Sequence, residues 1–181
     1  FNPVHVGHMI IANHMVQYTD LQQVWMVVSP HNPLKNKTSL AKDSDRYHLV
    51  QLAIGNNTKI KASNVEFSLP LPSYTIDTLT FLNEKYPKHT FSLIMGGDNL
   101  ENIEKWKNYT QILNHYDIYL YRRAGYNAEK YSNLPRVKQI NVPLLDISAT
   151  FIRQSIQEGK SVQYLVPDAV YEYLENSVMY K

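Results

Sequence analysis

The chain has 181 residues, and its 18 lysines and arginines against 16 aspartates and glutamates leave a net charge of only +2. This length predicts a single domain over residues 1–181, and the balanced charge, with no basic block, argues against a protein that coats nucleic acid. Cysteine is absent, which excludes disulfides and thiolate chemistry and fits a reducing compartment. With no signal peptide and no apolar run of transmembrane length, we expect a cytoplasmic protein without a membrane partner.

Short apolar runs alternate with helical patterns along the first half of the chain. The turn at Asn2-Pro3 precedes a pattern in which Ile11, Met15 and Tyr18 share one helical face. The expected elements that follow are a strand at 24–28, a two-proline loop at 29–35, a helix capped by Asp43 or Ser44 and ending at Gly55, strands at 59–63 and 65–69, and a helix that begins within 73–79.

The second half continues the alternation. We expect a strand at 90–95, one or two helices within 99–115, a strand at 117–121, a long loop to residue 136, a strand at 137–142, a helix from Ser148 to Gly159, and a last helix with Pro167 in its first turn. Strands that alternate with helices predict an α/β fold with a doubly wound parallel sheet. Ligands in such folds gather at the carboxyl ends of the strands.

Two histidines, His5 and His8, surround Gly7 at the expected start of the first helix. The free N–H groups and positive dipole end of a helix N-terminus bind anions, and a glycine without Cβ allows a phosphate to approach closely. Two further interpretations stay open, a structural cap and a metal pair. A metal pair is the least favoured, because no cysteine and no nearby aspartate or glutamate completes a ligand set.

A second candidate anion site lies at the start of the helix near residue 148. Ser148, Thr150 and Arg153 would offer two hydroxyls and a guanidinium beside the helix N-terminal amides, a combination that suits a polyphosphate. A plain N-cap role for Ser148 is the simpler alternative.

Other polar residues follow the expected strands. Lys35 lies on a loop from which it could reach a phosphoryl group, although it could equally be solvated. Asp98, after Gly96-Gly97, suits ribose hydroxyls or caps a helix. Trp106 is either a core residue or a stacking surface. No Walker A loop, dinucleotide-binding glycine pattern or Gly-x-Ser-x-Gly elbow is present, so those chemistries have no support.

The stretch Phe-Asn-Pro-Val-His-Val-Gly-His at residues 1–8 resembles the opening signature of the nucleotidyltransferase superfamily. The whole set of motifs resembles, more narrowly, the bacterial nicotinate mononucleotide adenylyltransferases. The further matching segments, in the family's order, are 29–35, 73–79, 95–100 followed by Trp106, Arg122-Arg123, and the Ile-Ser-Ala-Thr-Phe-Ile-Arg of 147–153.

The resemblance implies a Rossmann-like fold, ATP and nicotinate mononucleotide as substrates, and Mg²⁺ with the ATP. The catalytic residues would be His5, His8, Lys35 and Arg153. The ATP-binding residues would be Phe1, Asn2, His5, His8, Gly96, Asp98, Arg123, Ser148, Thr150 and Arg153. The residues that recognise the pyridine ring and its carboxylate would be Thr75, Trp106, Lys107 and Asn108.

In that family a strand and a Gly-Ser or Gly-Thr pair precede the phenylalanine, so we expect the first strand to lie before Phe1. Two other enzymes of the superfamily remain alternatives, a pantetheine-phosphate adenylyltransferase and a cytidylyltransferase. A non-catalytic nucleotide-binding module is the alternative from another class. The sequence leaves homo-oligomerisation open.

Overall fold

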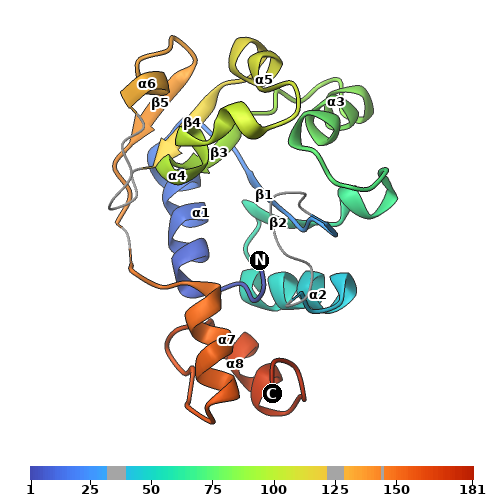
Figure 1. Ribbon diagram of the computed structural model, residues 1–181, viewed down its shortest axis with the longest axis vertical. Coiled ribbons are helices and arrows are strands. Elements are labelled where there is room, and N and C mark those ends of the chain that lie inside the picture. The colour runs from blue at the N-terminus through green and yellow to red at the C-terminus, as the bar shows by residue number, and fades with distance from the viewer. Residues whose placement is uncertain (32–39, 122–128, 144) are drawn as a thin grey trace. The chain divides into compact units, whose positions relative to one another are not determined.

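The computed structural model describes residues 1–31, 40–121, 129–143 and 145–181 (Figure 1). The chain divides into two compact units, one formed by residues 1–71 and 143–181 and the other by residues 72–142. Both units consist of short parallel strands and the helices that pack with them. The predicted α/β fold is therefore confirmed, while the prediction of one domain over residues 1–181 stays a prediction.

The first unit contains a pair of parallel strands and most of the longer helices. Its elements are α1 (Val6–Tyr18), β1 (Val24–Val27), α2 (Asp43–Ile54), β2 (Ile60–Ser63), the 3₁₀ helix η1 (Val65–Ser68), α7 (Ala149–Gln157) and α8 (Asp168–Glu175). The strand pair runs in register from Val24 opposite Ile60 to Val27 opposite Ser63. Helix α1 contacts both strands, and α2 contacts β2 and α8. Their buried apolar side chains, such as Met15 and Leu49, form the core of this unit.

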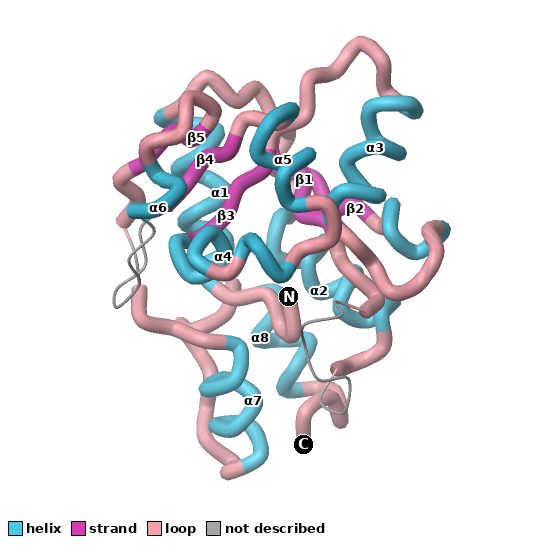
Figure 2. Tube along the Cα trace, turned by 45° about the horizontal axis from the view of Figure 1, so that its top comes forward, coloured by secondary structure: helices cyan, strands magenta, loops and turns pink. Residues whose placement is uncertain are grey.

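The second unit contains a parallel sheet of three strands in the order β3-β4-β5 (Figure 2). Its elements are α3 (Thr75–Lys85), β3 (Leu93–Gly96), α4 (Gly97–Glu101), the 3₁₀ helix η2 (Ile103–Lys105), α5 (Tyr109–His115), β4 (Ile118–Tyr121), α6 (Glu129–Ser132) and β5 (Val137–Ile140). The central strand β4 is buried along most of its length, as expected for a parallel strand with neighbours on both sides. The core of the second unit contains Met95, Leu100, Ile103, Ile112, Ile118 and Leu120.

The predicted strand at 65–69 is wrong, because these residues form the 3₁₀ helix η1. Local hydrogen bonds explain the difference. The Phe67 N–H donates to the Asn64 carbonyl at 2.9 Å, and the Ser68 hydroxyl donates to the Val65 carbonyl at 3.0 Å. Such short-range bonds compete with a strand for the backbone groups.

Two predicted helix boundaries also shift by one or two residues. The N-cap of α2 is Lys42, which makes no side-chain capping bond, and Asp43 and Ser44 lie inside the helix. The N-cap of α8 is Pro167 itself, so the proline precedes the first turn. None of the described helices reaches bilayer-spanning length with an apolar sequence.

A buried arginine joins three segments of the first unit. Arg46, on α2, is only 3% exposed. Its Nε donates to the Ala41 carbonyl at 3.1 Å and its Nη2 to the Ser29 carbonyl at 2.8 Å, while its Nη2 also pairs with the Asp43 carboxylate at 2.6 Å. Its Nη1 lies 3.5 Å from the Phe1 carbonyl oxygen. One guanidinium thus contacts three segments: the start of the chain, the residues after β1 and the residues before α2.

Replacing Arg46→Met should destabilise the protein, because the substitution keeps an unbranched side chain of similar length but removes every bond that the buried guanidinium donates to these carbonyls. We expect the free energy of unfolding to fall by about 2–4 kcal/mol in urea titrations. Arg136→Met is the control, since the Arg136 side chain is 50% exposed in its ion pair with Asp117. The control should change stability by less than about 1 kcal/mol. Equal, small effects of both substitutions would contradict the assigned role of Arg46.

Candidate functional site

The histidines of the opening motif lie at the start of α1. His5 is the N-cap residue in an extended conformation, and His8 lies one turn into the helix. The two imidazole rings are in contact, with centroids 3.7 Å apart and planes inclined by 34°. The ring of Phe1 meets the edge of the His8 ring at 4.8 Å. His5 is buried and His8 is partly exposed, so the second histidine is the more accessible to a ligand.

A backbone hydrogen bond determines which nitrogen of His8 carries the proton. The His5 N–H donates to Nδ1 of His8 at 3.2 Å. Because an amide nitrogen can only donate, Nδ1 is the acceptor, and the neutral ring carries its proton on Nε2. His8 can therefore offer an N–H donor from Nε2, which suits a phosphate oxygen.

Gly7 accommodates one of these rings. A Cβ placed on Gly7 would lie 3.1 Å from Nδ1 and 3.2 Å from Cε1 of His5. These distances are shorter than most contacts of a real Cβ, so a side chain at residue 7 would press on the imidazole. The position of His5 thus favours glycine between the two histidines, in addition to the close phosphate approach expected from the sequence.

The second candidate anion site lies at the start of α7. Ser148 is its N-cap, and its Oγ accepts a hydrogen bond from the Phe151 N–H at 3.1 Å, which confirms the predicted cap. The Arg153 Nη2 donates to the Thr150 hydroxyl at 3.4 Å, so these side chains lie together on the first turn. Ser148 and Thr150 are exposed, as a ligand-binding role requires.

A hydrogen bond joins the two helix starts across 151 residues of sequence. The Arg153 Nη1 donates to the Asn2 carbonyl oxygen at 2.8 Å. Figure 1 shows the first turn of α7 beside the N-terminal turn that leads into α1. Asn2 itself is buried, only 8% exposed. The structure therefore brings together the opening motif and the Ser148, Thr150 and Arg153 set within one unit.

Arg46 and Tyr180 also contact the opening segment, and the sequence did not point to either of them. Arg46 approaches the Phe1 carbonyl oxygen, and the Tyr180 hydroxyl donates to Asn2 Oδ1 at 2.8 Å. No motif, spacing or local composition distinguishes Arg46 from the other arginines, and Tyr180 is one of 14 tyrosines. Only the folded chain reveals their positions.

In the second unit, Gly96 and Asp98 are close together at the end of β3. A Cβ on Gly96 would lie 2.5 Å from Asp98 Oδ1 and 3.1 Å from the ring of Tyr121. The Asp98 carboxylate therefore occupies the space beside the Gly96 backbone, at the carboxyl end of a parallel strand where ligands commonly bind. The strand ends at this glycine, and α4 begins directly after it.

An ion pair connects the segment of Thr75 to the segment of Trp106. Thr75 is the first residue of α3, and the Lys107 Nζ donates to both carboxylate oxygens of Asp77 at 3.0 and 2.8 Å. Trp106 is partly buried against the core of its unit, which supports the core interpretation for part of its surface. Asn108 has a left-handed backbone, with φ 51°, and is the N-cap of α5.

The remaining sequence-predicted residues, Lys35 and Arg123, lie outside the described residues. Within the described ranges, no cluster of three or more His, Asp or Glu side chains could hold a metal ion. The assignment of individual residues to substrates therefore stays a prediction.

Comparison with known proteins identifies the family. The family model described as cytidylyltransferase-like matches residues 1–155. A probable nicotinate-nucleotide adenylyltransferase of Flavobacterium johnsoniae is 52% identical over 183 residues, an alignment that covers 100% of this chain and 95% of the relative. One of Cytophaga hutchinsonii is 50% identical and covers 96% of this chain and 91% of the relative.

Solved structures agree on the fold. The Plasmodium falciparum nicotinic acid mononucleotide adenylyltransferase complexed with NaAD superposes with a TM-score of 0.84 at 18% identity, covering 99% of this chain and 93% of that one. The same enzyme complexed with APC gives a TM-score of 0.82. The resemblance inferred from the sequence motifs is confirmed: the chain belongs to the cytidylyltransferase-like family and, within it, to the nicotinate-nucleotide adenylyltransferases.

Proposed function

We propose that this protein transfers the adenylyl group of ATP to nicotinate mononucleotide, giving nicotinate adenine dinucleotide and pyrophosphate in the biosynthesis of NAD. The observation that carries the proposal is the hydrogen bond from Arg153 to Asn2, because it joins two helix starts that each suit a phosphate. The full-length identity to relatives of that name supports the choice of substrates. A cytoplasmic location belongs to the proposal and agrees with the absence of cysteine.

The reaction needs alignment and charge neutralisation more than acid or base chemistry. An oxygen of the mononucleotide 5′-phosphate attacks the α-phosphorus of ATP, a new P–O bond forms, and the bond to the bridging oxygen of pyrophosphate breaks. The attacking phosphate is already anionic, so the enzyme need not remove a proton from it. Catalysis then depends on holding the two phosphates in line and on stabilising the charge that grows on the leaving pyrophosphate.

The first unit supplies the donors for this charge in our proposal. His8 would donate from Nε2, while His5 and the N-terminal amides of α1 add to the positive end of the helix. Arg153 uses two of its five N–H groups on Asn2 and Thr150 in the contacts described, so its guanidinium can still donate to a triphosphate. Ser148 and Thr150 would complete the triphosphate site, with Lys35 assisting.

Residues of the second unit would bind the nucleoside parts. Gly96 and Asp98 would meet ribose hydroxyls, and Arg123 would lie near the adenine. Trp106 would stack on the pyridine ring, with its other surface held by the core. The nicotinate carboxylate would accept from the backbone amides of Thr75 and of Lys107 or Asn108.

The ion pair of Lys107 supports this last assignment. Asp77 lies in the first turn of α3, where an unpaired carboxylate would repel an anionic ligand at the helix N-terminus. Lys107 neutralises that charge, and its side chain is thereby committed to Asp77, which leaves its backbone amide for the substrate. Within the described residues, the amides of Lys107 and Asn108 donate to no other backbone group.

Mg²⁺ would enter with the ATP. We expect the ion to be held mainly by phosphate oxygens and water, as Mg²⁺ bound with a nucleotide commonly is. The ion would reduce the charge on the triphosphate, and the protein groups named above would bind and orient the same phosphates.

The substrate assignment is tested by measuring pyrophosphate release from ATP and Mg²⁺ with three acceptors in separate reactions. Nicotinate mononucleotide should give the highest kcat/KM, ahead of nicotinamide mononucleotide, and pantetheine phosphate should give no release above background. Highest activity with pantetheine phosphate, or with CTP in place of ATP, would assign the chain to another branch of the superfamily. Nucleotide binding without release for any acceptor would indicate a non-catalytic module.

Replacing His8→Ala should lower kcat by about 10²–10³-fold, the scale for losing one donor that stabilises transition-state charge. The measurement is steady-state turnover with both substrates saturating. His14→Ala is the control on the same helix, because the His14 ring stacks on Tyr18 near the other end of α1. A rate close to wild type for the His8 variant would remove His8 from the catalytic set.

Replacing Trp106→Ala should raise the KM for nicotinate mononucleotide more than the KM for ATP, because only the pyridine ring would lose its stacking surface. Trp106→Phe should give a smaller change in the same direction, since it keeps an aromatic ring against the core. If the variants instead lose stability and raise both KM values equally, Trp106 is a core residue only.

A further inference from the structure

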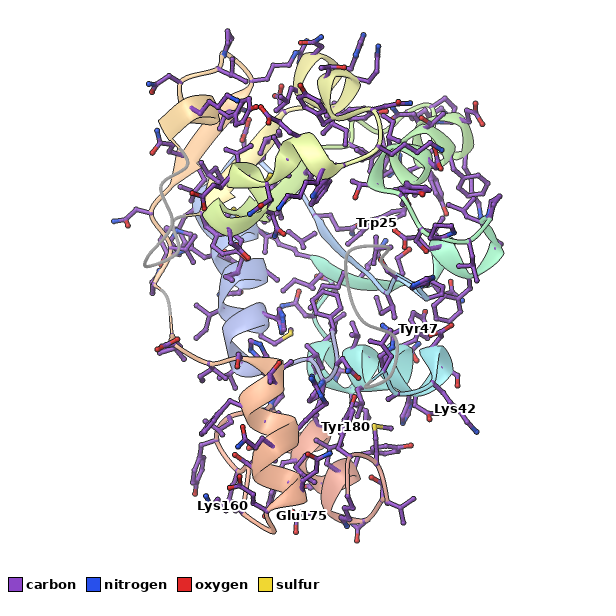
Figure 3. The ribbon with its side chains drawn as sticks, in the orientation of Figure 1. Trp25, Lys42, Tyr47, Lys160, Glu175 and Tyr180 are labelled. Atoms are coloured by element: carbon purple, nitrogen blue, oxygen red, sulfur yellow. The ribbon has the colours of Figure 1, made fainter. Side chains whose placement is uncertain are left out.

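The C-terminal segment after α8 returns to the start of the chain. Tyr180 lies in this segment, and its hydroxyl donates to Asn2 Oδ1 at 2.8 Å, across 178 residues of sequence. Figure 3 shows Tyr180 among the helices of the first unit, close to the C-terminal end. The phenol is partly buried there. None of the sequence motifs of the nucleotide site includes this residue.

Asn2 receives three donors from three separate segments. Its side-chain oxygen accepts from the Tyr180 hydroxyl and also from the Ala41 N–H at 3.2 Å. Its backbone carbonyl accepts from the Arg153 guanidinium. An amide oxygen has two lone pairs, so the two bonds to Oδ1 use its acceptor capacity and fix the side chain of this buried residue. Asn2 thus connects the C-terminal segment to the arginine of the proposed triphosphate site.

Tyr180 and Arg153 also line one cavity, of about 500 Å³, at the surface of the first unit. Its other lining residues include Lys42, Asp45 and Tyr173. Burial raises the pKa of the Tyr180 phenol well above its ordinary value, with the nearby charges of Arg46 and Arg153 opposing the rise. The phenol therefore keeps its proton and remains a hydrogen-bond donor throughout the neutral range.

The backbone at Tyr180 is left-handed, with φ 66°. This conformation is unfavourable for a residue other than glycine, so it persists only where the surroundings stabilise it. The packing of the ring and the bond to Asn2 hold Tyr180 in this conformation. The position of the hydroxyl is therefore a result of specific packing in the C-terminal segment.

We propose that Tyr180 is a positioning residue of the nucleotide site, which acts through Asn2 to hold the Arg153 guanidinium in place for the ATP phosphates. The inference deepens the proposed function and rests on the triphosphate role assigned to Arg153. Without the phenol, Asn2 loses one of the two bonds to its side-chain oxygen, and the carbonyl that holds Arg153 becomes less well fixed. The expected consequence is weaker ATP binding with little change at the mononucleotide.

The test is Tyr180→Phe, which keeps the ring and removes only the hydroxyl. We expect the Kd for ATP with Mg²⁺, measured by calorimetry, and the KM for ATP to rise about 3–10-fold, the effect of losing one hydrogen bond. The KM for nicotinate mononucleotide should stay within about twofold, and kcat should change less than the ATP KM. Tyr173→Phe is the matched control, because it removes a phenol from the lining of the same cavity, and it should leave all constants unchanged.

A double-mutant cycle separates positioning from general packing. In an Asn2→Ala background the acceptor is gone, so adding Tyr180→Phe should not weaken ATP binding further. Equal effects of Tyr180→Phe in both backgrounds, or equal rises of both KM values, would overturn the inference, as would an ATP affinity equal to wild type. Circular dichroism confirms that each variant is folded.

A wild type that binds ATP but forms no dinucleotide would refute the proposed function, while the comparison of ATP affinities would still decide the role of Tyr180.

Discussion

The hydrogen bond between the Arg153 guanidinium and the Asn2 carbonyl is the contact on which the proposed triphosphate site depends. Each helix start alone offers a dipole end and one or two polar side chains, which bind a single phosphate weakly. A triphosphate carries several charges over a larger span, so its recognition requires donors from separate parts of the chain. The contact across 151 residues brings the two helix starts together within one unit, as the proposed site requires.

Two glycines, one in each unit, have a polar side chain close to their backbone. At Gly7 and at Gly96 the space where a Cβ would stand is bounded by a functional side chain, the His5 imidazole in one case and the Asp98 carboxylate in the other. Neither glycine has a positive φ, so conformational freedom does not explain them. The absence of a Cβ lets a polar side chain lie against the main chain at each of them.

Local patterns in the sequence were sufficient for much of the fold. The alternation of apolar runs and helical periodicity located the five strands of the described residues, and the N-cap role of Ser148 followed from residue type alone. The strand predicted at 65–69 failed because periodicity does not register short-range bonds of the kind that Ser68 makes. Arg46 and Tyr180 could not be predicted, since their partners are fixed by tertiary contacts that leave no local signature.

The opening motif admitted a phosphate site, a helix cap and a metal pair; the geometry shows the helix cap, and the phosphate site stays a prediction. The bond from the His5 amide to Nδ1 of His8 supports the helix start, and it also determines which ring nitrogen remains for a ligand. One side chain can therefore satisfy the backbone and face the substrate at once. The metal-pair alternative gains no support, because the described residues supply no further ligands around the two rings.

The tautomer of His8 has a consequence for how such an enzyme chooses its substrate. In the proposed reaction, an imidazole that donates from Nε2 would stabilise charge and accept no proton, so the chemical centre would make no demand on the basicity of the attacking group. Discrimination must then come from the end of the acceptor remote from the reacting atoms, where Thr75, Trp106 and Asn108 would contact the ring. Changes in those segments could redirect the enzyme to a new acceptor while its catalytic apparatus stays the same.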